Sequence, residues 1–133
     1  MDTIDFKNKK ILVTGGKGFL GALLCQTLQQ HHANVYCIDT KDCLLPQEYC
    51  VDITNKKAVC ECIQKIQPDI VFHLAAILDR GNELSGFEKI HSVNYQGTIN
   101  LLIALQNTSC ENFIFTSTSE IYGANETPFT ENM

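Results

Sequence analysis

The sequence predicts an α/β fold built on a doubly wound parallel sheet. Short apolar runs of strand length alternate with longer segments in which apolar residues recur at helical spacing. This alternation is typical of parallel strands joined by crossover helices. The 133 residues are enough for one domain with its own core but not for two. Because 44% of residues are hydrophobic and 19% are charged, we expect neither disorder nor membrane spans, and we assign residues 1–133 to one domain.

The predicted elements follow one another in the order β-α-β-β-α-β-α-β. A short apolar run bounded by polar residues or glycines indicates a strand, and apolar residues recurring every three to four positions indicate an amphipathic helix. Thr54 or Asn55 can cap the second helix, and Pro68 ends it. The expected strands are residues 10–14, 34–39, 49–51, 69–74 and 112–117; the expected helices are residues 18–30, 55–67 and 92–107, the last preceded by a loop containing Gly81 and Gly86.

This order of elements is that of the first and larger part of a Rossmann-type nucleotide-binding domain. It predicts five parallel strands in the spatial order 3-2-1-4-5, with helices on both faces of the sheet. Residues 118–133 are too few for a further helix and strand. We therefore expect an incomplete sheet whose fifth strand is an unpaired edge.

Charge and cysteine content disfavour several classes of function. The net charge is −5 and the lysines are scattered, which argues against a nucleic-acid-binding protein. The seven cysteines include no Cys-x-x-Cys pair and no histidine at zinc-site spacing, so we expect no metal. The first residues contain no apolar segment typical of a secretion signal, which predicts a cytoplasmic protein with reduced thiols and no membrane contact.

A Gly-x-Gly-x-x-Gly pattern lies between the first predicted strand and the first predicted helix. Such glycines permit a tight turn and let a pyrophosphate approach the backbone at a helix N-terminus, whose free N–H groups favour an anion. Asp39 ends the next predicted strand, about 20 residues further on. An acid there accepts hydrogen bonds from the adenosine ribose and repels a 2′-phosphate, so we predict NAD rather than NADP. Lys41 would reach a 2′-phosphate only if its loop folded back. The glycines are Gly15, Gly16, Gly18 and Gly21.

Five motifs together resemble the extended short-chain dehydrogenase/reductases, in particular the NAD-dependent nucleotide-sugar epimerase/dehydratase family. They occupy residues 14–21, 52–53, 73–76, 94–98 with 101–102, and 115–123, in the family's order. The resemblance implies a nucleotide-sugar substrate that is transiently oxidised at C4 of the sugar. It also implies a subunit interface on the helix of residues 92–107. With the unpaired fifth strand, this predicts a homodimer or larger species.

The resemblance implies a cofactor site drawn from several parts of the chain. Asp52 would accept a hydrogen bond from the adenine amino group, with Ile53 against the ring. Three small or apolar residues from position 74 onward would line the path of the nicotinamide-side ribose and the phosphates, and Asn94 would brace the region after the fourth strand. The expected cofactor-binding residues are Gly15, Gly18, Phe19, Leu20, Gly21, Asp39, Asp52, Ile53, Leu74, Ala75, Ala76 and Asn94.

The resemblance also suggests which residues take part in catalysis. Thr118 matches the Ser/Thr that holds the sugar oxygen. Glu120 is a candidate catalytic residue, because Thr-Ser-Glu is similar to the uronic-acid decarboxylase and some epimerase branches, although it can equally be a solvated charge in a turn. Ser119 stands where the 4,6-dehydratases carry Asp, which puts dehydration in doubt. Tyr122 matches a structural tyrosine of the family.

The family's general base belongs to a Tyr-x-x-x-Lys pair, and none of the four tyrosines begins one. The sequence therefore predicts the NAD-binding portion of an epimerase, dehydratase or decarboxylase. The alternative is a non-catalytic nucleotide-binding or regulatory module.

Overall fold

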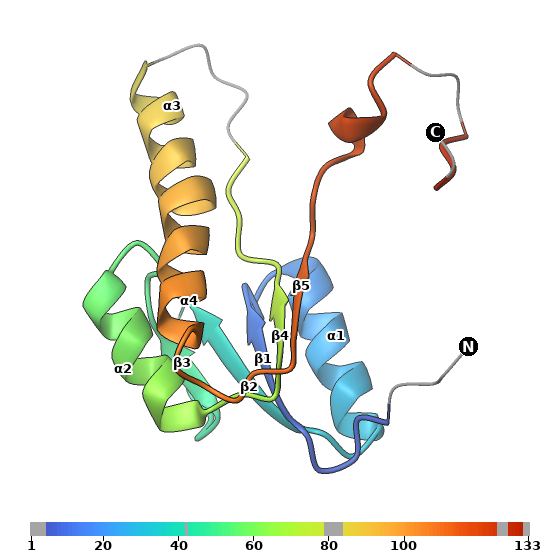
Figure 1. Cartoon of the computed structure of the whole chain (residues 1–133), viewed down its shortest axis with the longest axis vertical. Helices are drawn as coiled ribbons and strands as arrows, with labels where there is room; N and C mark the ends of the chain where they lie inside the picture. The colour runs from blue at the N-terminus through green and yellow to red at the C-terminus, as the bar shows by residue number, and fades with distance from the viewer. Residues whose placement is uncertain (1–4, 42, 79–83, 125–127, 132–133) are drawn as a thin grey trace.

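The computed structural model describes residues 5–41, 43–78, 84–124 and 128–131. Its elements alternate between strands and helices as the sequence pattern predicts (Figure 1). The strands are β1 (Lys10–Thr14), β2 (Asn34–Asp39), β3 (Glu48–Cys50), β4 (Ile70–His73) and β5 (Asn112–Phe115). The helices are α1 (Phe19–Gln30), α2 (Lys56–Ile66), α3 (Leu84–Ile90) and α4 (Thr98–Leu105), with a π-helical segment His91–Gly97 and a 3-10 helix Ser119–Tyr122.

The five strands form one parallel sheet in the order β3-β2-β1-β4-β5, which confirms the predicted topology. In the centre, β1 aligns Ile11 with Val35 of β2 on one side and with Ile70 of β4 on the other. β5 is an edge of this sheet, as expected. Because every strand runs in the same direction, the carboxyl ends of all five lie along one edge, where doubly wound sheets bind their ligands.

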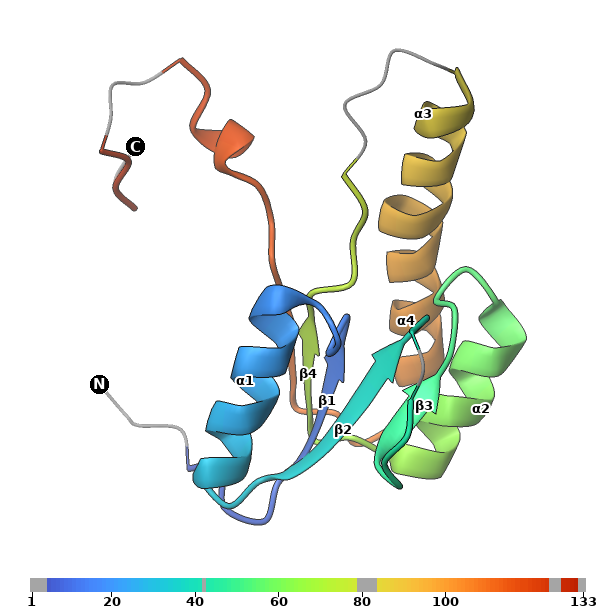
Figure 2. The ribbon, with the colours of Figure 1, turned by 180° about the vertical axis from the view of Figure 1, so that it is seen from behind.

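Helices cover both faces of the sheet. α1 lies on one face, and α2 with α4 lies on the other (Figure 2). Successive side chains of β1 point to opposite faces of the sheet. Ile11 and Val13 pack beneath α1, while Leu12 packs with α2 and α4. The core on the α2 and α4 face is Leu12, Ile38, Ile53, Val59, Cys62, Ile63, Ile66, Val71, Leu101 and Ala104; the core on the α1 face is Ile11, Val13, Leu28, Val35 and Ile70.

The ends of α2 follow its sequence signals. The Asn55 side-chain oxygen accepts a hydrogen bond from the Ala58 amide at 3.1 Å, so Asn55 caps the helix. The helix closes at Gln67, whose φ of 50° is left-handed, immediately before Pro68. These local signals predict both ends of α2 to within one residue.

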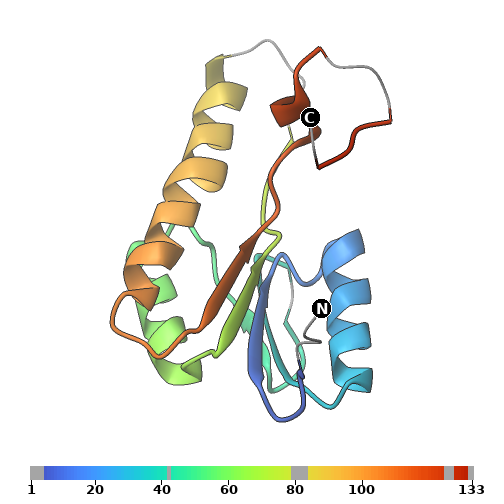
Figure 3. The same cartoon turned by 45° about the vertical axis from the view of Figure 1, so that its right-hand side comes forward.

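The helix expected to begin near residue 92 begins instead at Leu84, and that prediction is wrong. α3, the π-helical segment and α4 form one continuous rod, and Gly86 lies inside α3 rather than in a loop (Figure 3). Gly81 lies outside the described residues. Leu84 and Phe87 are 74% and 66% exposed. Because this part of the rod extends beyond the sheet, its apolar residues follow no burial pattern that could reveal a helix.

Beyond β5 the chain leaves the sheet. A 3-10 helix begins after Thr118, and the Tyr122 ring stacks on Phe129 with centroids 4.9 Å apart. In the parts of the chain that the structure describes, no helix has the length and hydrophobicity to cross a membrane.

Candidate functional site

The turn between β1 and α1 holds the glycine-rich motif at the carboxyl edge of the sheet. The Gly15 amide donates to the Ile38 carbonyl at 2.8 Å, and the Gly18 amide donates to the Gly15 carbonyl at 3.0 Å. Gly15 has a φ of +71°, and a Cβ there would lie 2.9 Å from the backbone of Ala75. Only glycine tolerates both conditions, so the ends of β1 and β4 approach as closely as this residue permits.

The first turn of α1 presents backbone rather than side chains to this edge. A Cβ on Gly21 would lie 2.2 Å from the Gly15 carbonyl oxygen, so the helix packs directly on the turn. Gly18 caps α1 without a side-chain hydrogen bond, which leaves the first N–H groups for an anion. The side chain of Phe19 is 95% exposed, and that of Leu20 is also exposed.

Asp39 ends β2 beside this turn. One carboxylate oxygen accepts a hydrogen bond from the Lys17 amide at 2.9 Å, and the other accepts from the Lys41 amide at 3.1 Å. Each oxygen keeps a lone pair for a further donor, such as a ribose hydroxyl. The carboxylate is therefore held in place by the backbone on both sides.

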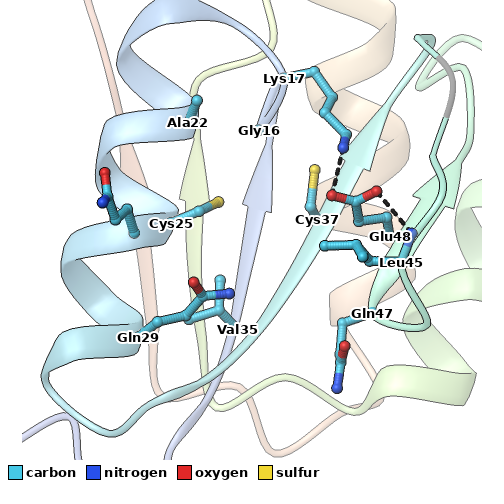
Figure 4. Close-up of a pocket in the computed structure, with 11 residues that line it drawn as sticks. Gly16, Lys17, Ala22, Cys25, Gln29, Val35, Cys37, Leu45, Gln47 and Glu48 are labelled. Carbon is cyan, nitrogen blue, oxygen red and sulfur yellow. Dashed lines mark hydrogen bonds and ion pairs between the residues drawn. The ribbon is translucent and has the colours of Figure 1, made fainter.

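The Lys17 side chain pairs with Glu48 (Figure 4). The second oxygen of Glu48 accepts from the Leu44 and Leu45 amides at 2.8 and 3.0 Å. The hydrogen bond from Lys17 lowers the pKa of Glu48 and raises the pKa of Lys17 itself. Both groups therefore stay charged near neutral pH, and the Lys17 ammonium remains engaged.

A pocket of about 540 Å³ opens at the carboxyl ends of the strands. It brings together residues that the sequence places far apart, and Lys41 and Lys89 add two cations that suit a pyrophosphate. Sequence reasoning missed Lys89, because the helix that carries it was expected to start after it. The predicted cofactor residues in its wall are Gly15, Gly18, Asp39, Asp52, Ile53, Leu74, Ala75 and Ala76; Phe19, Leu20 and Gly21 are not among its lining residues.

The segment Asp52–Ile53 is held against this pocket by the long helix. Asn100 is buried and its side-chain amide donates to the carbonyls of Ile53 and Thr54 at 2.9 and 3.1 Å. A Cβ on Gly97 would lie 2.6 Å from the Ile53 side chain, so the helix and this segment are in close contact. Neither Gly97 nor Asn100 was predicted to support the site. Their partners lie more than 40 residues away, beyond the range of any local pattern.

A second pocket of about 300 Å³ adjoins the first and shares Ala75 and Ala76 with it. Asn94 lies in its wall, and its side chain both accepts from the Ile77 amide and donates to the Ile77 carbonyl, each at 2.9 Å. Asn94 thus fixes the chain that follows β4 to the π-helical segment, and π-helical turns are often found at functional sites.

Of the two candidate catalytic residues, only one lies among the residues that line a pocket. Thr118 is among the residues that line the second pocket, and its hydroxyl oxygen accepts from the Glu120 amide at 3.3 Å. Glu120 is exposed on the 3-10 helix and is not among the lining residues of that pocket. Among the described residues, no three His, Cys, Asp or Glu side chains come together in a way that could hold a metal.

His73, at the end of β4, is hydrogen-bonded both to the end of β1 and to the start of α4. Its ring nitrogens lie 2.7 Å from the Thr14 hydroxyl oxygen and 2.8 Å from the Thr98 hydroxyl oxygen. Thr98 donates its own proton to the Asn94 carbonyl at 2.7 Å, so it accepts from His73 Nε2–H. Thr14 then donates to Nδ1 and accepts from the Ala75 amide at 3.1 Å. Burial lowers the pKa of His73 to about 4, and the ring is neutral near pH 7.

Comparisons with known proteins agree with this geometry. The sequence model of the NAD dependent epimerase/dehydratase family matches residues 11–133. The UDP-N-acetyl-alpha-D-glucosaminuronate decarboxylase of Bacillus cytotoxicus is 31% identical over 93% of this chain, and the 3-beta-hydroxysteroid dehydrogenase of Mycolicibacterium neoaurum is 34% identical over 84%. The UDP-glucose-4-epimerase of Stenotrophomonas maltophila, solved with bound NAD and formylated UDP-arabinopyranose, superposes over 93% of this chain with a TM-score of 0.81 and 27% identity.

The chain corresponds to only a part of these proteins. It spans 41% of the decarboxylase, 32% of the steroid dehydrogenase and 41% of the solved epimerase. The family match covers every element from β1 onward, including the glycine-rich turn and both pockets. On the strength of that match, this chain belongs to the NAD-dependent epimerase/dehydratase family.

Proposed function

We propose that this chain is the NAD-binding portion of an enzyme that epimerises, dehydrates or decarboxylates a nucleotide sugar. The observation that carries the proposal is one continuous site. The pocket at the glycine-rich turn and Asp39 joins, through Ala75 and Ala76, a second pocket that contains Thr118. Residues 1–133 form the cofactor domain in this proposal.

The residues present suit each part of the cofactor. The N-terminus of α1, which has no side-chain cap, favours the two negative charges of a pyrophosphate together with Lys41 and Lys89 in the pocket. Asp39 offers acceptor oxygens to the two ribose hydroxyls, while its charge disfavours a 2′-phosphate. Asp52 and Ile53 provide an acceptor and a buried apolar surface for the adenine.

NAD, when bound, supplies the acceptor for the hydride that leaves C4 of the sugar. In this proposal Thr118 holds the sugar oxygen by a hydrogen bond and Glu120 acts on the substrate from the 3-10 helix. The hydroxyl proton at C4 must pass to a base, and a threonine hydroxyl is far too weakly basic for that task. Since no tyrosine here is followed by lysine four residues later, the chain binds and orients but does not by itself move that proton.

A non-catalytic nucleotide-binding module remains the second candidate. It is favoured by the same missing Tyr-x-x-x-Lys pair, since such a module would need the cofactor pocket but no general base. The two candidates share the cofactor pocket, so NAD binding supports both. They differ at Thr118, which matters only for a substrate.

Calorimetric titration of the pure chain with NAD and with NADP tests the proposal. We expect NAD to bind more tightly, and Asp39→Asn to narrow the difference because the substitution removes the repulsion of a 2′-phosphate. Glu111→Gln is the matched control, since it removes a carboxylate that pairs with Lys9 at the opposite edge of the sheet. Preference of the unmutated chain for NADP, or binding of neither nucleotide, would overturn the proposal.

A further inference from the structure

Two cysteines face each other beneath the glycine-rich turn, in a pocket that the proposed function does not use. Cys25 comes from the inner face of α1 and Cys37 from β2, and Figure 4 shows their sulfur atoms pointing into the space between the helix and the sheet. Both line a pocket of about 210 Å³, which also contains Gly16 and the Lys17–Glu48 ion pair. The volume is several times that of a water molecule, so a small peroxide can enter.

The two sulfur atoms are close to each other and to the turn. A Cβ built on Gly16 would lie 2.3 Å from the Cys37 sulfur and 3.4 Å from the Cys25 sulfur, so the sulfurs are separated by no more than the sum of these distances. The Cys37 sulfur therefore fills the space that a side chain at position 16 would occupy.

The surroundings of the two thiols shift their pKa values in opposite directions. The neighbouring Cys37 thiol lowers the pKa of Cys25, and the nearby Lys17 ammonium lowers it further, whereas burial and Glu48 oppose these effects. The neighbouring Cys25 thiol, together with burial, raises the pKa of Cys37. Cys25 is half-buried and Cys37 is buried. A more acidic, more accessible thiol beside a protonated partner is the arrangement found in redox-active cysteine pairs.

We propose that Cys25 and Cys37 form a thiol pair that a hydroperoxide converts into a disulfide, cross-linking α1 to β2 under the glycine-rich turn. The Cys25 thiolate attacks one peroxide oxygen, the O–O bond breaks, and hydroxide or alkoxide leaves and takes up a proton. The resulting sulfenic acid is attacked by the Cys37 sulfur, and water leaves with the Cys37 proton. The two thiols lose two electrons, and the peroxide gains them.

The disulfide alters the turn that we assign to the pyrophosphate. A disulfide holds its sulfurs about 2.05 Å apart, so at least one of the two sulfurs must leave its present place beside Gly16 when the bond forms. α1 and the turn then shift relative to β2. This consequence rests on the proposed function. We expect NAD to bind about tenfold more weakly to the oxidised chain, which is the effect of losing one hydrogen bond to a charged group.

Peptide mapping after treatment with hydrogen peroxide tests the pair directly. Trypsin cuts after Lys17 and Lys41 and leaves both cysteines in one peptide, whose mass falls by two hydrogens when the disulfide forms. Chymotrypsin then cuts after Tyr36, between the cysteines, and the two fragments stay joined until a reductant is added. Calorimetry on the same samples measures NAD affinity before oxidation, after oxidation and after reduction.

Variants distinguish this pair from the other thiols. Cys25→Ser and Cys37→Ser should each abolish the linked fragments and the loss of affinity, while Cys110→Ser, at the far end of β5, should change neither. A Cys25–Cys37 peptide that stays reduced while other cysteines oxidise would overturn the proposal. Linked fragments with unchanged NAD affinity would overturn the coupling to the turn. If the reduced chain binds no NAD, the proposed function fails, and the peptide masses still decide the fate of the pair.

Discussion

His73 should make the stability of this protein depend on pH in a way that can be calculated. Burial lowers the pKa of its ring from 6.5 to about 4, whereas the unfolded chain protonates it near pH 6.5. Between these values the unfolded state holds one proton more than the folded state. Lowering the pH therefore favours unfolding, by about 1.4 kcal/mol per pH unit. Across the interval of about 2.5 units the free energy of unfolding should fall by about 3 kcal/mol, and this loss should end below pH 4.

Burial causes that shift, and the hydrogen bonds determine which ring nitrogen carries the proton. Thr98 already donates to the Asn94 carbonyl, so His73 Nε2 must carry the proton, and Nδ1 must accept from Thr14. With a second proton on Nδ1, Thr14 would accept from both Nδ1–H and the Ala75 amide, and its own hydroxyl proton would lose the acceptor that it has in the neutral state. Protonation would thus place a charge in the buried ring and leave the Thr14 hydroxyl proton without its partner.

Urea denaturation followed by circular dichroism between pH 7 and pH 4.5 measures the effect. His73→Asn should be less stable than the unmutated chain at pH 7, because it loses the two ring hydrogen bonds. It should also lose less stability on acidification, by up to about 3 kcal/mol. His31→Asn, an exposed position just after α1, should keep the original pH dependence. Equal slopes for the unmutated chain and His73→Asn would refute the assignment of a buried neutral ring.

Four further outcomes are expected. Adding Glu48→Gln to Asp39→Asn should improve NADP binding beyond Asp39→Asn alone, because it releases the Lys17 ammonium; calorimetry that shows no additional gain would contradict this role of the ion pair. The isolated chain should show no turnover of nucleotide sugars or 3β-hydroxysteroids, and a rate of about 1 per second or more would show that the base has been misidentified. Gly21→Ala should lower the free energy of unfolding by about 1–3 kcal/mol, since its Cβ would overlap the Gly15 carbonyl, whereas Gly18→Ala, whose Cβ would lie 3.2 Å from that carbonyl oxygen, is the less crowded comparison. The chain should associate at micromolar concentrations through β5 or through the α4 face that carries Leu102, which is 41% exposed; light scattering should show a dimer or larger species, and a stable monomer would refute this.

The sequence by itself determined the architecture, because the signals that encode it are short in range. Runs of apolar residues set the strands, helical spacing set α1 and α2, and the order of elements implied the sheet order 3-2-1-4-5. The glycine-rich turn could also be predicted, since its glycines are required by close contacts within the turn or beside it. The start of the long helix could not be predicted in this way, because Leu84 and Phe87 are exposed and so form no pattern of buried residues at helical spacing.

Only the tertiary structure decided which polar side chains meet. Thr14 and His73 are 59 residues apart in the chain, and Asn100 lies 47 residues from the carbonyl that it holds. Cys25 and Cys37 give no motif in the sequence, yet helix α1 packs on β2 so that both sulfurs lie beside Gly16. Such pairs depend on the packing of helices against the sheet and on strand register, and local sequence patterns carry no information about either.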